Sequence, residues 1–168
     1  MEDKDKIHLI TNIFKEEQRK QLVKDCKPLL WTPDELEKVY QANIDYAGKQ
    51  TPSVMHTLPQ FNWVYTGILH TIKRVLNLDL IVMRSWVNWS NGKKMDIRWH
   101  SHADAHYSCV YYMKTFPLFS NGTLFRDQFI KSPQNSLILF EGHLEHTAPS
   151  SPLPFSRYTL ALDLNRKG

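Results

Sequence analysis

The spacing of hydrophobic residues divides the chain into two parts of different texture. In the first part, residues 1–77, apolar positions recur at helical intervals, as in Val64, Ile68 and Ile72. In the second part, residues 78–168, β-branched and aromatic residues gather in short runs that Gly or Pro residues separate. The pattern therefore predicts helices followed by strands.

The best-marked helix lies in the middle of the first part. Thr32 and Glu35 have the spacing of a capping box, and Pro33 suits the first turn. This helix should run to about Tyr46 and stop at Gly48. The predicted elements are helices over Glu16–Cys26, 33–46 and Phe61–Leu76, and strands over Ile7–Ile10, Leu80–Trp89, His106–Met113, Gly122–Phe125, Ser136–Phe140 and Ser156–Leu164.

Several short strands with regular breaks are typical of a sandwich or jelly roll. We therefore expect a single domain over residues 1–168, of the α+β class and mainly β. Residues 78–168 would form the jelly-roll core that carries any catalytic site. The helices of residues 1–77 would support one of its sheets.

The composition is that of an ordinary globular protein, with 42% of residues hydrophobic and 23% charged. The net charge of +4 is too small, and the Lys and Arg residues are too scattered, to indicate a nucleic-acid partner. The first residues lack the apolar core of a signal peptide, and no apolar run reaches transmembrane length. With two distant cysteines read as reduced thiols, these features predict a soluble cytoplasmic protein without a membrane partner. They indicate no particular oligomeric state.

Side chains that bind metals gather between Trp99 and His106. In an extended segment, residues two apart face the same side, so His102 and Asp104 can bind one ion together. His146 is the natural third ligand from a distant segment. Two His and one carboxylate leave three octahedral positions open, the arrangement of non-haem Fe(II) oxygenases. A His-x-Asp alone is more often part of a polar loop, so this interpretation needs a second signal.

Arg157 supplies that signal, because it lies in an apolar strand, where an unpaired arginine is costly. By alternation, Arg157 and Thr159 share one face of the strand, while Tyr158, Leu160 and Leu162 share the other. A guanidinium offers a planar, bidentate fork for a buried carboxylate. That carboxylate would belong either to a ligand or to an acidic side chain of the protein itself.

Together, His102-x-Asp104, His146 and Arg157-x-Thr159 resemble the signature of Fe(II)/2-oxoglutarate-dependent dioxygenases, most closely small phage and bacterial proteins of the prolyl-hydroxylase-like branch. The resemblance implies a double-stranded β-helix, which is a jelly roll with the metal between its sheets, and supporting N-terminal helices. It also implies that Tyr112 helps Arg157 and Thr159 to hold 2-oxoglutarate. The matching segments, which span about Leu80 to Leu164, are Ser85–Asn88, Ser108–Met113, Gly122–Asp127, Leu137–Phe140 and Thr147–Pro149.

One departure from the family pattern concerns the ligands. Small phage and bacterial members often carry His-x-His-Pro where this chain has His100-Ser101-His102-Ala103, which makes His100 a candidate ligand. Because the Pro is absent and Asp104 is present, we expect His102, Asp104 and His146 to hold the metal. The candidate substrate contacts are then Asn88, Trp89, His100 and His106.

The resemblance implies an enzyme that uses Fe(II), 2-oxoglutarate and O₂ to hydroxylate a C–H bond, with decarboxylation of 2-oxoglutarate to succinate. It favours a peptidyl or amino-acid-like substrate, carried by a protein, a peptide or a small molecule. Two alternatives stay open. An oxygenase acting on nucleic-acid bases would use a second Arg on the last strand, where this chain has Asp163. A non-catalytic, metal-binding jelly-roll module would bind no 2-oxoglutarate.

Overall fold

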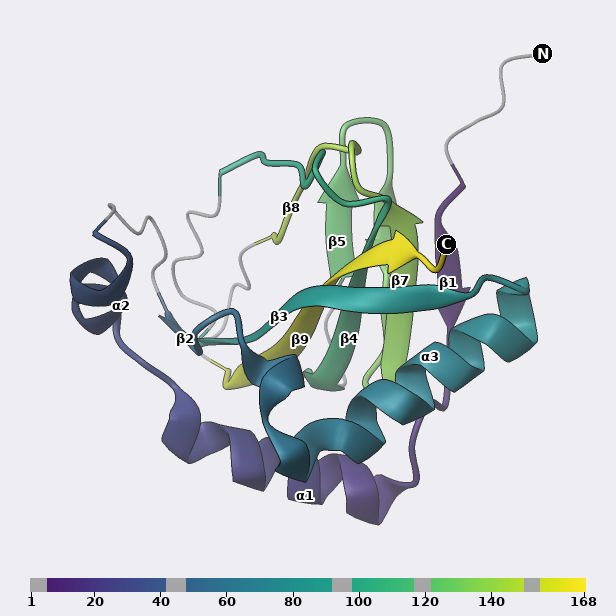
Figure 1. The fold of residues 1–168 in the computed structure, drawn as a ribbon. Coiled ribbons are helices and arrows are strands. Elements are labelled where there is room, and N and C mark those ends of the chain that lie inside the picture. The colour runs from purple at the N-terminus through teal and green to yellow at the C-terminus, as the bar shows by residue number, and fades with distance from the viewer. Residues whose placement is uncertain (1–5, 42–47, 92–97, 117–121, 150–154) are drawn as a thin grey trace.

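The strands form two antiparallel sheets, the larger in the order β1-β7-β4-β9-β3-β2 and the smaller in the order β6-β5-β8 (Figure 1). The computed structural model describes residues 6–41, 48–91, 98–116, 122–149 and 155–168. The strands are β1 (His8–Ile10), β2 (Lys49–Gln50), β3 (Leu80–Ser90), β4 (Tyr107–Lys114), β5 (Gly122–Phe125), β6 (Phe129–Lys131), β7 (Ser136–Glu141), β8 (His146–Thr147) and β9 (Arg157–Arg166).

Strand β9 lies inside the larger sheet, between β3 and β4. It pairs with β3 from Leu80↔Arg166 to Ser90↔Arg157, with a register shift between Val82 and Arg84. It pairs with β4 along the opposite edge. Because it is hydrogen-bonded on both sides and covered on both faces, every residue from Arg157 to Leu164 is buried.

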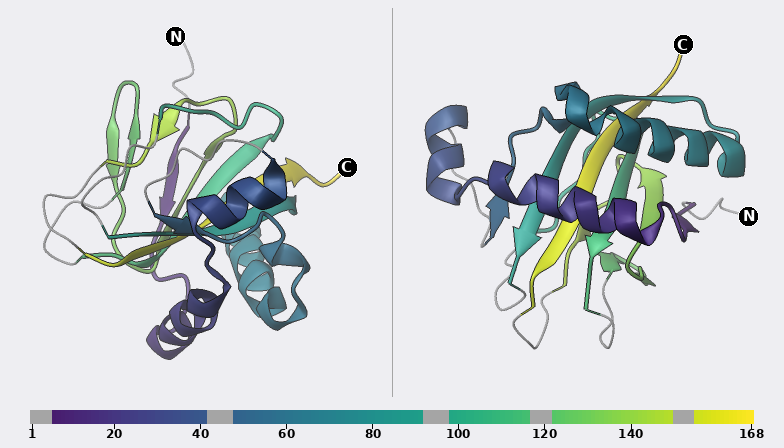
Figure 2. Two further views of the ribbon diagram at one scale, coloured as in Figure 1. Left: turned by 90° about the vertical axis from the view of Figure 1, so that its left-hand side faces the viewer. Right: turned by 90° about the horizontal axis from the view of Figure 1, so that it is seen from below.

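Two helices, α1 (Glu16–Cys26) and α3 (Asn62–Leu76), lie across one face of the larger sheet (Figure 2). Leu22, Ile68 and Ile72 of these helices belong to the main apolar core. The sheet contributes alternate residues to this core, namely Cys109, Tyr111 and Met113 of β4, Leu137 and Leu139 of β7, and Tyr158, Leu160, Leu162 and Leu164 of β9. The third α-helix, α2, covers Pro33–Tyr40, and short 3-10 helices cover Lys27–Leu29, Met55–Thr57 and Pro59–Phe61.

The other face of the larger sheet is turned toward the smaller sheet. A second apolar cluster joins Tyr112, Ile138 and Phe140 of the larger sheet to Phe125 of β5. These residues alternate along β4 and β7 with those that face the helices. The predicted arrangement, a mainly β jelly roll with helices supporting one sheet, is therefore confirmed.

The long elements follow the sequence pattern closely. The helix at Glu16–Cys26 and the strand at Gly122–Phe125 have the predicted ends, and the other long elements differ by a few residues. Three short strands, β2, β6 and β8, were not predicted, because two or three residues are too few to show an alternation.

Helix α2 begins as predicted but ends early. The capping box forms, with the Glu35 N–H donating to Thr32 Oγ1 at 3.3 Å and the Thr32 N–H donating to Glu35 Oε2 at 2.7 Å. Gln41 adopts a left-handed conformation with φ of 51°, and its N–H donates to Glu37 O at 2.8 Å. This C-cap ends the helix at Tyr40, so the predicted extension toward Tyr46 is wrong at Gln41. Residues 42–47 lie outside the described part of the chain.

Both cysteines are free thiols buried in the core, as the sequence suggested. Burial raises the pKa of the Cys26 thiol to about 12, so this group is a packing residue at neutral pH. Among the described residues, no helix has the length and apolar character needed to cross a bilayer.

Helix α3 offers a matched test of this packing. Ile68 is 0% exposed against the sheet, whereas Val75 of the same helix is 47% exposed. Ile68→Ala should lower the free energy of unfolding by about 2–5 kcal/mol, because it leaves a cavity between helix and sheet. Val75→Ala should change it by less than about 0.5 kcal/mol. Chemical denaturation of the two variants measures both values, and equal losses would contradict the packing described.

Candidate metal centre

Three histidines from two distant segments converge between the sheets. His100 and His102 lie just before β4, and His146 lies in β8. Each offers a ring nitrogen, and these atoms all lie within 4.8 Å of one another. The backbone sets this meeting, because the His100 N–H donates to His146 O at 3.1 Å and the His146 N–H donates to His100 O at 2.9 Å.

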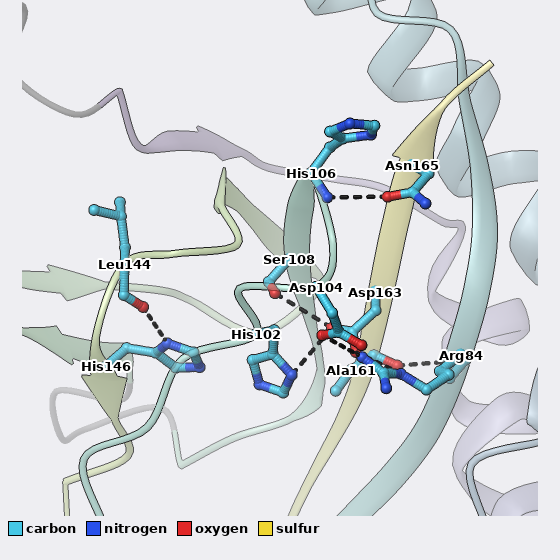
Figure 3. A network of polar contacts seen from close by, with 11 residues as sticks. Arg84, His102, Asp104, His106, Ser108, Leu144, His146, Ala161, Asp163 and Asn165 are labelled. Atoms are coloured by element: carbon cyan, nitrogen blue, oxygen red, sulfur yellow. Dashed lines mark hydrogen bonds and ion pairs between the residues drawn. The ribbon is translucent and has the colours of Figure 1, made fainter. Parts of the chain in front are cut away.

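Each of the three rings directs Nδ1 at an oxygen acceptor. His100 Nδ1 lies 2.8 Å from Arg98 O, and His146 Nδ1 lies 2.9 Å from Leu144 O. His102 Nδ1 lies 3.2 Å from Asp163 Oδ1 (Figure 3). A carbonyl or carboxylate oxygen only accepts, so the contacts assign the hydrogen to Nδ1 in every ring. The lone pair is then on Nε2, and this is how proteins orient histidines that bind metals.

The surroundings favour the uncharged form of two of these rings, His100 and His146. Burial lowers the pKa of His146 to about 4 and also lowers the pKa of His100. The ring of Phe140 lies 4.8 Å from that of His146, so one wall of the group is apolar. Neutral imidazole is the form that binds metal ions, and at neutral pH His100 and His146 need to release no proton to do so.

Asp104, which the sequence suggested as a ligand, is not brought to these histidines. Its carboxylate is 61% exposed and accepts a hydrogen bond from Arg84 Nη2 at 2.9 Å. The prediction assumed extended backbone, but the chain turns here, with the Ala105 N–H donating to His102 O at 2.9 Å. Because a turn breaks the two-residue alternation, Asp104 lies outside the group of converging ligand atoms, although it lines the same cavity. The third side chain that converges with His102 and His146 is that of His100.

The residues expected to hold 2-oxoglutarate lie together on the inner face. Arg157 is 9% exposed, and its guanidinium lies 5.5 Å from the centre of the Tyr112 ring. Its Nη2 donates to Gly122 O at 3.4 Å. The Tyr112 hydroxyl is hydrogen-bonded to the Thr123 hydroxyl of β5. Burial raises the pKa of Tyr112, so the phenol stays protonated as a donor.

A single cavity of about 600 Å³ joins the histidines to Arg157. Besides the three histidines, its lining includes Gln50, Trp86, Asn88, Arg98, Thr123, Phe140, Arg157, Thr159 and Asp163. Arg157 and Thr159 therefore share a face of β9, as alternation predicts, and Tyr158, Leu160 and Leu162 pack on the helical side. A ligand that binds metal at one end and a guanidinium at the other fits this arrangement of donors.

The remaining candidate substrate contacts divide into two groups. Asn88 lines the cavity and accepts a hydrogen bond from Gln50 Nε2 at 2.7 Å. Trp89 packs against the main core, and its Nε1 donates to Ser156 Oγ at 2.6 Å. His106 Nδ1 accepts the Arg166 N–H at 3.1 Å, at the far end of β9 from Arg157. Neither Trp89 nor His106 is part of the cavity lining.

Asp163 is a buried residue of the site to which the sequence pattern gave no role. In the sequence this position was noted only because a nucleic-acid-base oxygenase would have an arginine there. Asp163 is 1% exposed and accepts hydrogen bonds from Arg84 and Ser108, and its Oδ1 lies 3.2 Å from His102 Nδ1 (Figure 3). The signal was present in the sequence, because Asp163 falls on the same alternating face as Arg157 and Thr159. A carboxylate on the polar face of a buried strand requires several donors.

Known structures share this architecture. EctD from S. alaskensis, solved with bound Fe, is 16% identical, with a TM-score of 0.70 over 98% of this chain and 74% of that one. HygX from Streptomyces hygroscopicus, solved with nickel, 2-oxoglutarate and hygromycin B, is 10% identical, with a TM-score of 0.68 over 98% and 84%. A Pseudomonas putida prolyl-4-hydroxylase is 12% identical, with a TM-score of 0.63 over 98% and 94%.

Sequence comparison alone gives no such likeness, because no family model and no curated protein matches this chain. The similarity to these proteins is therefore a similarity of fold, at identities of 10% to 16%. It confirms the double-stranded β-helix that the sequence resemblance implied.

Gly142 follows β7 directly and is hydrogen-bonded to His102, so its substitution tests how the turn before β4 is held in place. Its carbonyl accepts the His102 N–H at 2.7 Å, and an added Cβ would lie 2.2 Å from Ala105 O and 2.6 Å from His102 O. Gly142→Ala should therefore displace the turn, lower the free energy of unfolding by about 1–3 kcal/mol and weaken metal binding. Gly168→Ala is the control, because nothing lies within 4 Å of that position. Melting curves and Co(II) titrations of both variants check this, and a Gly142→Ala protein identical to wild type would refute it.

Proposed function

We propose that this protein is an Fe(II)- and 2-oxoglutarate-dependent dioxygenase that hydroxylates a C–H bond, with decarboxylation of 2-oxoglutarate to succinate. One observation carries the proposal: a single cavity contains three histidines whose ring nitrogens lie within 4.8 Å of one another and, on β9, a buried arginine. The fold similarity to iron and 2-oxoglutarate oxygenases supports it.

The metal ligands in this proposal are His100, His102 and His146. Three imidazole ligands leave three positions of an octahedral ion open for a co-substrate and O₂. Imidazole nitrogen suits Fe(II) and related first-row ions. Asp104 would first have to leave Arg84 and the surrounding water before it could reach the metal, so it remains outside the proposed set.

Arg157 is proposed to bind the distal carboxylate of 2-oxoglutarate through its planar fork, with Thr159 and Tyr112 as hydroxyl donors. Bound iron with 2-oxoglutarate and O₂ would supply the oxidising power for C–H hydroxylation. The protein's own part is to fix the dicarboxylate at the guanidinium, to hold the imidazoles in one tautomer and to exclude water. The burial of Arg157 and Tyr112 serves the last of these tasks.

For the substrate we propose a peptidyl or amino-acid-like molecule. The cavity wall at β2 and β3 carries Trp86 and the hydrogen-bonded amides of Gln50 and Asn88. Neutral amides beside an indole offer donors, acceptors and apolar area that match a peptide group. Of the neighbours, the Pseudomonas putida protein is a prolyl-4-hydroxylase, and EctD has also been solved with 5-hydroxyectoine.

The two alternatives make different predictions. A nucleic-acid-base oxygenase is disfavoured, because the position of its second arginine is held by Asp163, which is engaged by Arg84 and His102. A non-catalytic binding module would bind metal without 2-oxoglutarate. Thermal shift or tryptophan fluorescence with Mn(II), in the presence and absence of 2-oxoglutarate, separates this module from the enzyme.

The ligand set can be tested by substitution. His100→Ala should abolish tight binding of Co(II), because it removes one of three ligands, whereas Asp104→Ala should keep it. Isothermal titration and the visible spectrum of Co(II) report affinity and coordination number. The opposite result, with binding lost in Asp104→Ala and kept in His100→Ala, would restore the ligand set predicted from the sequence.

Arg157→Gln tests the co-substrate site. Loss of one partner of a buried ion pair should weaken 2-oxoglutarate binding by on the order of 100-fold. Metal affinity should stay unchanged, because the side chain lies outside the proposed ligand set. Titration of the anaerobic Mn(II) protein with 2-oxoglutarate measures the first effect, and Co(II) titration measures the second.

The catalytic part of the proposal needs turnover as its readout. Wild-type protein supplied with Fe(II), 2-oxoglutarate and O₂ should release succinate, and Arg157→Gln should release far less at the same concentrations. Wild-type protein that binds metal but neither binds 2-oxoglutarate nor forms succinate would be the non-catalytic module, and the proposal would fail.

A further inference from the structure

We infer that Asp163 is a positioning residue that places a negative charge behind His102, in the role that a carboxylate ligand fills when it binds the metal directly. The inference rests on the proposed metal site. It concerns the contact of Asp163 Oδ1 with His102 Nδ1 at 3.2 Å, which is the one Nδ1 contact in the histidine group made to a charged acceptor.

The two oxygens of Asp163 have separate partners. Oδ2 accepts from Arg84 Nε at 2.9 Å and from Arg84 Nη2 at 2.7 Å. Oδ1 faces His102, with the Ser108 hydroxyl donating to it at 3.3 Å. Arg84 therefore holds Oδ2 of Asp163 in place, and Oδ1 is the oxygen that contacts the His102 ring. At 1% exposure the carboxylate exchanges none of these partners for water.

Strand register builds this arrangement. Asp163 of β9 stands directly opposite Arg84 of β3 and opposite Ser108 of β4. The register shift between Val82 and Arg84 lies immediately before this pair, so Met83 is passed over and Arg84 faces the cavity. A position fixed by two strand pairings holds its carboxylate more firmly than a loop would.

The net charge of Arg84, Asp104 and Asp163 explains why a carboxylate beside His102 matters. Arg84 contributes one positive charge, and Asp104 and Asp163 contribute one negative charge each, with Arg84 Nη2 shared between the two carboxylates. The network therefore carries one net negative charge. A metal site built from three imidazole ligands contributes no negative charge to the ion. A site built from two imidazoles and a carboxylate contributes one negative charge. Through the His102 ring, Asp163 restores the charge that a directly bound carboxylate would have given.

Asp163→Asn tests this, because it keeps the shape and an acceptor oxygen while removing the charge. Co(II) affinity should fall by about 10–100-fold, as for other groups that hydrogen-bond to metal ligands. The Fe(III)/Fe(II) potential should rise, because a nearby negative charge stabilises the ferric ion. Anaerobic titration and redox titration measure the two effects, and neither depends on turnover.

The matched control is Asp104→Asn. It also removes one negative charge that is paired with Arg84, but at an exposed position. It should lower Co(II) affinity by less than Asp163→Asn does, because water screens much of an exposed charge. If Asp163→Asn equals wild type, or if both variants weaken binding equally, the inference is overturned. If wild-type protein binds no metal, the proposed function falls with it, which distinguishes the two failures.

A measurement on wild-type protein decides the matter if Asp163→Asn does not fold. In Zn(II)-loaded protein with ¹⁵N-labelled histidine, the Nδ1 proton of His102 should resonate further downfield than those of His100 and His146. A carboxylate is a stronger acceptor than the carbonyls of Arg98 and Leu144, which serve the other two rings. Three equivalent Nδ1 protons would overturn the inference.

Discussion

The burial of β9 on both faces is the constraint on which the site depends. A strand with no free edge and no solvent face must give every polar side chain a partner. Its large apolar residues pack against the helices, and the polar ones, Arg157, Thr159 and Asp163, line the cavity. One strand thereby places the proposed anion-binding group at one end of the site and a carboxylate behind the histidines near the other.

Local patterns were enough to predict what lies on regular elements. Alternation along β9 separated Arg157 and Thr159 from Leu160 and Leu162. In the structure the first pair lines the cavity and both leucines belong to the main core, although Leu162 also borders the cavity. The start of α2 followed from Thr32 and Glu35, because a capping box depends only on residues three apart. The jelly roll followed from short apolar runs with regular breaks.

Features set by turns and distant pairings could not be predicted in the same way. The turn at residues 103–106 separates Asp104 from His102, and nothing in the sequence distinguishes it from an extended segment. The hydrogen bonds between His100 and His146 join residues far apart in the chain, so no local rule could find them. Trp89 and His106 lie near the motif in sequence, but strand geometry turns them away from the cavity.

The three histidines come from both layers of the jelly roll, since His100 and His102 lead into β4 of the larger sheet and His146 belongs to β8 of the smaller one. An ion held by all three would act as a cross-link between the layers. The free energy of coordination would then be part of the free energy of folding. Supply of the metal would therefore govern how long the chain survives as a folded protein, as well as whether it can react.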